Sequence, residues 1–219
     1  MRILICSLLI SVSLFSQKRQ VYTNTKPYEQ VIAEFSALDK NSEIAFMSPF
    51  GMTDAGKPLH VFILSSDKTF TPGKAKENGK CVILINNAIH PGEPDGVDAS
   101  LELAKTYTAN PKLLPANVVL VIIPIYNIDG YLNRGSYSRA NQNGPEQYGF
   151  RGNAKNLDLN RDFIKADAQN TISFQQIFQQ WKPDILIDNH VSDGADYQYT
   201  MTLIATQRNK LHPLVSEYM

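Results

Sequence analysis

The chain has 219 residues, of which 43% are hydrophobic and 19% are charged. Such a composition is typical of one globular domain, and it excludes a disordered or fibrous chain. Basic residues and acidic residues both number 21, so no net positive charge favours a nucleic acid or an anionic membrane as the partner.

The N-terminus has the pattern of a secretory signal peptide. Arg2 precedes a short apolar run, Ile3 to Phe15, which is shorter than the roughly 20 apolar residues that span a bilayer. We predict cleavage after Ser16, so that residues 1–16 are a leader and residues 17–219 form the domain. The expected location is secreted or periplasmic, without membrane attachment after cleavage.

The two cysteines are separated by this predicted cleavage. Cys6 lies in the leader, whereas Cys81 lies in an apolar run. The mature domain can therefore form no internal disulfide, and we expect Cys81 to be a small buried apolar residue.

Helical and strand patterns alternate along the rest of the chain. Apolar residues recur at helical spacing in three segments: 27–38, 95–107 and 168–181. Short apolar runs bounded by turn-forming residues predict strands in five segments: 59–64, 81–85, 118–125, 185–188 and 199–206. This alternation predicts an α/β fold with a mixed, largely parallel sheet sandwiched between helices. The nearly continuous apolar run at 118–125 is typical of a strand covered on both faces.

Polar clusters follow three of these predicted strands. They are NNAIHPGE at 86–93, YNIDG at 126–130 and DNH at 188–190. Functional groups of open α/β sheets gather beyond the carboxyl ends of strands, so we expect a site there. A long polar stretch, 127–156, exceeds the usual length of a connection and is typical of a functional loop.

His90 and Glu93 form the first candidate ligand pair. They stand three residues apart across a Pro-Gly turn, and His190 could complete the two-histidine, one-carboxylate set of catalytic zinc sites. Two neutral imidazoles and one carboxylate would leave zinc with net positive charge, which lowers the pKa of bound water. The alternative is an ordinary polar turn without a metal. His60 and His212 lack a carboxylate at similar spacing, and we do not expect them to be ligands.

The segment LDLNRDF at 157–163 points to recognition of an anion. Arg161 could hold a carboxylate through two parallel hydrogen bonds, and the Asn160 amide could donate a third. The alternative is a solvated Arg161 that pairs with Asp162.

In their order, these motifs resemble the zinc carboxypeptidases of the carboxypeptidase A/B type. The resemblance rests on HPGE at 90–93, NIDG at 127–130, DLNRDF at 158–163 and NH at 189–190. It implies that His90, Glu93 and His190 bind Zn²⁺. It also implies that Asn160 and Arg161 hold the terminal carboxylate of a peptide or protein substrate.

The resemblance implies two further roles around this metal. Asp158 would orient the first zinc histidine, since ligating imidazoles commonly donate their other N–H to a carboxylate. An arginine of the long loop would steady the scissile carbonyl. We choose Arg139 for this role, with Arg134 and Arg151 as rivals because loop lengths vary.

One feature departs from the family pattern. Members carry a glutamate general base several dozen residues after the third zinc ligand, whereas only 219 − 190 = 29 residues follow His190, and their one glutamate, Glu217, comes too early. We expect either the N-terminal portion of a C-terminally truncated carboxypeptidase domain or a protein that lost its base. A related zinc amidohydrolase or cell-wall peptidase, and a non-catalytic zinc- and peptide-binding module, are the alternatives.

Overall fold

A computed structural model describes residues 24–140, 142, 144–192, 198 and 205–218 of the chain. The predicted leader lies outside these residues. So does most of the strand predicted at 199–206, since its residues 199–204 are not described.

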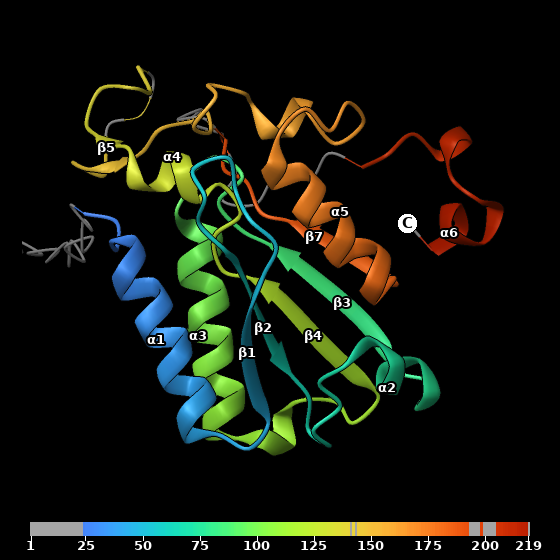
Figure 1. Cartoon of the computed structure of the whole chain (residues 1–219). Helices are drawn as coiled ribbons and strands as arrows, with labels where there is room; N and C mark the ends of the chain where they lie inside the picture. Colours follow the sequence, from blue (N-terminus) through green and yellow to red (C-terminus); the bar gives the residue numbers. More distant parts are fainter. Residues whose placement is uncertain (1–23, 141, 143, 193–197, 199–204, 219) are drawn as a thin grey trace, which may run out of the picture.

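A five-stranded mixed sheet forms the centre of the described structure (Figure 1). Its strands follow the order β1-β2-β4-β3-β7. In chain order they are β1 Ala45–Phe50, β2 Leu59–Leu64, β3 Cys81–Asn86, β4 Val118–Ile123 and β7 Ile185–Asp188. Strand β2 is antiparallel to both of its neighbours, whereas β4, β3 and β7 run parallel. The predicted mixed sheet is confirmed, with its parallel pairing confined to these last three strands.

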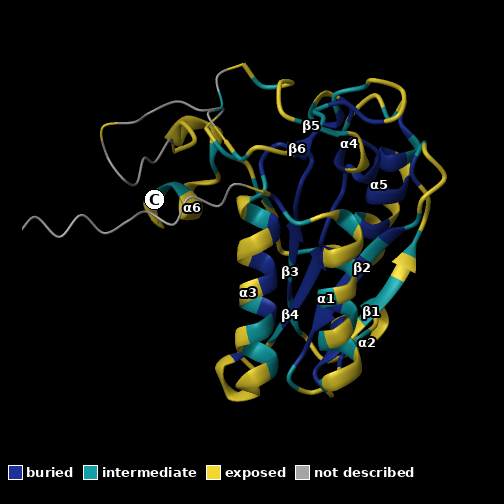
Figure 2. Ribbon diagram, turned by 90° about the vertical axis from the view of Figure 1, so that its left-hand side faces the viewer, coloured by how far each residue is buried: buried dark blue, intermediate teal, exposed yellow. Residues whose placement is uncertain are grey.

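Helices cover both faces of this sheet (Figures 1 and 2). On one face lie α1 and α3, and on the other lies α5. Their bounds are Tyr28–Asn41, Asp95–Ala109 and Gln169–Trp181. The short helices are α2 Pro72–Glu77, α4 Ile128–Leu132, α6 Pro213–Tyr218 and three 3₁₀ turns, η1 Pro111–Leu113, η2 Leu159–Arg161 and η3 Arg208–Lys210. Two short antiparallel strands, β5 Arg134–Gly135 and β6 Tyr148–Gly149, form a separate two-stranded sheet.

The core fills the two spaces between the sheet and its helices. Strand β4 is buried from its second residue to its last, which confirms the prediction of a strand covered on both faces. From one side α1 contributes Phe35, whose ring packs edge-on against Phe62 of β2 at 4.9 Å between centroids. From the other side α5 buries Phe174 and Ile177. Full burial of each such side chain stabilises the fold by about 1.5–3 kcal/mol.

Two details differ from the sequence-based expectation. The sequence does not predict strand β1, because Ser48 and Pro49 break its apolar pattern. The strand lies at the edge of the sheet and pairs only with β2, so it tolerates a proline, which cannot donate a ladder hydrogen bond. Cys81 is half-buried rather than buried, since it is the first residue of β3.

The carboxyl ends of β4, β3 and β7 meet at one edge of the sheet because these strands are parallel. Asn86 and Asp188, the last residues of β3 and β7, are direct partners across the ladder. All three predicted polar clusters therefore begin at the same edge. Among the described residues, no helix is both long and apolar enough to cross a bilayer.

Candidate metal centre

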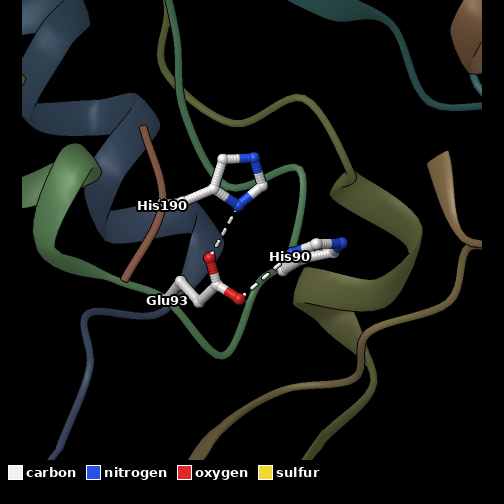
Figure 3. A group of neighbouring side chains, drawn as sticks. All are labelled: His90, Glu93 and His190. Atoms are coloured by element: carbon white, nitrogen blue, oxygen red, sulfur yellow. Dashed lines mark hydrogen bonds and ion pairs between the residues drawn. The ribbon is translucent and has the colours of Figure 1, made fainter. Parts of the chain in front are cut away.

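His90, Glu93 and His190 converge on one point at this edge (Figure 3). One possible ligand atom from each residue lies within 4.8 Å of the other two. The Glu93 carboxylate stands between the rings, with Oε1 3.0 Å from Nδ1 of His90 and Oε2 2.9 Å from Nδ1 of His190. The predicted convergence of these three side chains is confirmed.

The loop after β3 brings the first two of these residues together. The Glu93 N–H donates to the His90 carbonyl at 2.9 Å, which closes the turn made by the HPGE motif. Both side chains are almost fully buried, with 2% of each residue exposed. A Cβ at Gly92 would meet Cδ of Arg139, so a larger residue there would displace the Arg139 side chain.

Each imidazole is held from behind by a carboxylate. Nε2 of His90 lies 3.0 Å from Asp158 Oδ1, the neighbour that the family resemblance implies. Nε2 of His190 lies 3.1 Å from Asp188 Oδ2, a contact that the sequence reasoning missed. The sequence contains an indication of this contact, because Asp188 and His190 are two residues apart at the end of a strand, a spacing that places both side chains on one face. Both rings thus point Nδ1 toward Glu93.

This donor set fits a zinc ion. Two imidazole nitrogens and a carboxylate oxygen are ligand types that zinc binds, and one such atom from each residue lies within 4.8 Å of the other two. Because a carboxylate behind each ring accepts a proton at Nε2, the Nδ1 lone pair is left for a metal. Three protein donors leave one coordination position open.

The charges in the cluster are strongly coupled. Burial by itself would raise the pKa of Glu93, but hydrogen bonds from His190, His90 and the Val191 N–H outweigh it and hold that pKa well below its usual range. Hydrogen bonds to Asp188 and to Glu93 raise the pKa of His190 to about 9. Without a metal the site therefore favours a cationic His190, and a divalent cation would replace its proton.

Two arginines face this cluster. Nη2 of Arg139 donates to Glu93 Oε1 at 2.9 Å. Arg151 donates from Nε to Asp158 Oδ2 at 3.0 Å, and its Nη1 lies 4.0 Å from the same Glu93 oxygen. Arg134, the other rival, instead donates from Nη2 to the backbone and hydroxyl oxygens of Thr25, at 2.9 and 2.6 Å. It anchors the start of the described chain.

The NIDG motif is a structural support for these segments. Asn127 caps α4 by accepting from the Gly130 N–H at 2.9 Å. Its amide donates to the Arg151 carbonyl at 2.9 Å and to the Ile89 carbonyl at 3.3 Å. One buried side chain therefore links the loop of the first zinc-ligand candidate to the loop that carries Arg151.

Asn160 and Arg161 stand on η2, next to the cluster. The carboxylate of Asp158 caps this short helix by accepting from the Asn160 N–H at 3.0 Å. The Arg161 side chain is exposed and donates to the Asn160 carbonyl at 2.9 Å. Asp162 is buried and accepts from the Asp167 and Ala168 N–H groups, each at 3.0 Å, so the alternative pairing with Arg161 is wrong.

The remaining histidines lie elsewhere, as expected. His60 is half-buried on β2, and His212 is exposed near α6. Neither belongs to the metal-ligand cluster found among the described residues.

The model of the zinc carboxypeptidase family matches residues 29–207. The chain belongs to this family. Carboxypeptidase 2 of Trichophyton tonsurans is 26% identical over 153 residues, which cover 68% of this chain and 25% of that protein.

Solved structures of carboxypeptidases share the fold. A metallo-carboxypeptidase from Burkholderia cenocepacia has a TM-score of 0.61 at 20% identity, over 80% of this chain and 44% of that one. A metallo-carboxypeptidase from Pseudomonas aeruginosa, in complex with (2-guanidinoethylmercapto)succinic acid, has a TM-score of 0.57 at 18% identity, over 77% and 41%. The chain spans about a quarter of the length of the curated relatives and less than half of these two structures.

Proposed function

We propose that the whole protein is a zinc-dependent metallocarboxypeptidase that hydrolyses C-terminal peptide bonds. The observation that carries this proposal is the convergence of His90, Glu93 and His190, with a carboxylate behind each ring. Membership of the zinc carboxypeptidase family supports zinc as the ion. When bound, zinc supplies a Lewis acid that polarises a carbonyl oxygen and makes a water molecule more acidic.

We assign stabilisation of the developing oxyanion to Arg139. Its side chain is only 8% exposed and its guanidinium directly contacts Glu93, so it stands beside the position of the metal. Arg151 is held by Asp158 and lies farther from Glu93. A buried cation fixed in place before the reaction stabilises developing negative charge more than a mobile one in water does.

Asn160 and Arg161 would hold the terminal carboxylate of the substrate. Arg161 is exposed beside the cluster, where its guanidinium can take up a bidentate contact. The succinic acid derivative bound by the Pseudomonas aeruginosa enzyme carries carboxylates, which agrees with this type of ligand.

Peptides with free and amidated C-termini test the proposal in the full-length protein. The wild type should release C-terminal residues, be inhibited by a metal chelator and cleave amidated peptides poorly. Arg161→Ala should lower turnover of free peptides at least ~10-fold, because a charge-assisted contact shielded from water is lost. The matched control is Lys165→Ala, since Lys165 is an exposed cation four residues away that pairs with Asp167. Equal turnover of both peptides would favour the amidohydrolase or cell-wall peptidase.

A specific observation favours a second candidate, a non-catalytic module that binds zinc and peptide. The three carboxylates that contact the imidazoles, those of Glu93, Asp158 and Asp188, are all engaged with those rings. Within the described part of the chain, Glu146 and Glu217 are exposed and form no part of the cluster. Zinc and peptide binding without turnover would support this candidate.

We also propose that the protein is exported, on the basis of the apolar run after Arg2. N-terminal sequencing of secreted or periplasmic material should begin at Gln17. Recovery of the protein with Met1 in the cytoplasm would contradict the proposal.

A further inference from the structure

We propose that Asp188 is a positioning residue that directs Nδ1 of His190 toward the metal. The inference rests on the proposed zinc centre and deepens it, since it concerns how the third ligand is oriented. Asp188 is not itself one of the three candidate ligands.

Both oxygens of Asp188 are occupied by defined donors. Oδ2 lies 3.1 Å from Nε2 of His190, and Oδ1 accepts from the Asn86 amide at 2.9 Å. Asn86 is fully buried at the end of β3, and it is the ladder partner of Asp188. The carboxylate is therefore fixed by the neighbouring strand through Oδ1, and Oδ2 faces the imidazole.

The protonation pattern follows from this contact. An ionised carboxylate can only accept a hydrogen bond, so with a metal at Nδ1 the His190 ring would donate its Nε2–H to Asp188. Nδ1 then faces Glu93 at 2.9 Å, as a ligand atom should. His90 has the same arrangement with Asp158, so the two imidazoles are presented in the same way by carboxylates from different segments.

His190 depends on this bond more than His90 depends on its own. The His90 side chain is 3% exposed and is constrained by packing, whereas the His190 side chain is 32% exposed. A ring with less packing around it keeps more rotational freedom, and a hydrogen bond must then provide more of its orientation.

The backbone around Asp188 is itself held in place. The Asn189 N–H donates to the Asn86 carbonyl at 3.0 Å. The Asn189 side chain donates to Asn87 Oδ1 at 2.7 Å. These bonds fix the end of β7 against the end of β3, so the Asp188 carboxylate approaches the ring from a rigid support.

Zinc affinity of the full-length protein, measured by competition with a chromophoric chelator, tests this role. Asp188→Ala should weaken Zn²⁺ binding by about 100-fold and Asp188→Asn by about tenfold, because loss of a partner behind a ligating histidine typically costs 10–100-fold and an amide oxygen can still accept from Nε2. The matched control is Asp184→Ala. Asp184 also links β7 to β3, by accepting from the Val82 N–H at 2.8 Å, but it lies at the other end of the strand. This control should change zinc affinity less than about twofold.

Thermal unfolding of the zinc-free proteins establishes whether each variant is folded. If Asp188→Ala is unfolded, the zinc affinity of Asp188→Asn alone decides the question. Wild-type affinity in the folded Asp188 variants would overturn the inference while the zinc centre stands. An equal loss in Asp184→Ala would also overturn it, because the effect would then come from strand pairing. A wild-type protein that binds no zinc would refute the metal centre and this inference together.

Discussion

Replacing Asp158 by alanine tests how one carboxylate serves two parts of the site. Oδ1 of Asp158 lies 3.0 Å from Nε2 of His90 and accepts from the Asn160 N–H at 3.0 Å. Oδ2 accepts from Nε of Arg151 at 3.0 Å. The substitution therefore removes a hydrogen-bond partner from the His90 ring, from the start of η2 and from Arg151 at the same time.

These contacts set the expected size of each effect. Loss of the partner behind His90 should weaken zinc binding about 10–100-fold, or about 1.4–2.7 kcal/mol. Loss of the cap on η2 should cost about 1 kcal/mol of stability in the zinc-free protein. The Arg151 ion pair adds little, because both partners are partly exposed, by 37% and 27%. We therefore expect a moderate loss of stability and a large loss of zinc affinity.

Chelator competition measures the zinc affinity, and urea unfolding of the zinc-free protein measures the stability. Asp162→Ala is the control, since Asp162 lies in the same segment, is more deeply buried and also accepts from backbone N–H groups, yet does not contact His90. It should destabilise the protein at least as much and leave zinc affinity near the wild-type value. If both variants lost zinc to the same degree, loosening of the segment would explain the result and the orienting role of Asp158 would be refuted.

Two further predictions concern the metal and the pH dependence of stability. After dialysis, metal analysis should find stoichiometric zinc in His60→Ala and none in His190→Ala; zinc retained by the latter would contradict the ligand assignment. Hydrogen bonds from Lys80, Ser65 and Thr69 hold the pKa of Asp67 well below its usual range, so its folded pKa lies below its unfolded value. This stabilisation is present above about pH 4 and is lost as the pH falls through the folded pKa. Urea midpoints should therefore show Asp67→Asn less stable than wild type at pH 7, with the difference shrinking in acid.

Much of the fold could be predicted because local pattern and tertiary environment agree. The apolar run of β4 is buried on both faces, and the spacing of Val31 and Phe35 turns the buried face of α1 toward the sheet. Strand β1 could not be predicted, because its conformation depends on pairing with β2 rather than on its own residues. Helix α4 could not be predicted either, because it lies in the long polar segment and is only five residues long. Its start is defined by the Asn127 side chain, which caps it.

The sequence predicts the cluster of candidate ligands but not every residue that contacts it. Residue type and position after a strand single out His90, Glu93 and His190 as candidate ligands, and the family resemblance adds Asp158. No sequence pattern tells which of three loop arginines faces the site, since this depends on how the loop folds back. The structure turns Arg134 toward Thr25 and leaves Arg139 and Arg151 at Glu93.

The three candidate ligands come from two segments of the fold, and a metal bound to all three would link these segments. His90 and Glu93 come from one buried turn after β3, whereas His190 follows β7, which pairs with β3. A zinc ion shared by Glu93 and His190 would add a link between the end of β7 and the turn that follows β3. Because a ligand that binds only the folded state adds its binding free energy to stability, a bound zinc ion would reinforce the pairing of β7 with β3. The carboxylates behind the rings would then support the fold through the same contacts that orient the ligands.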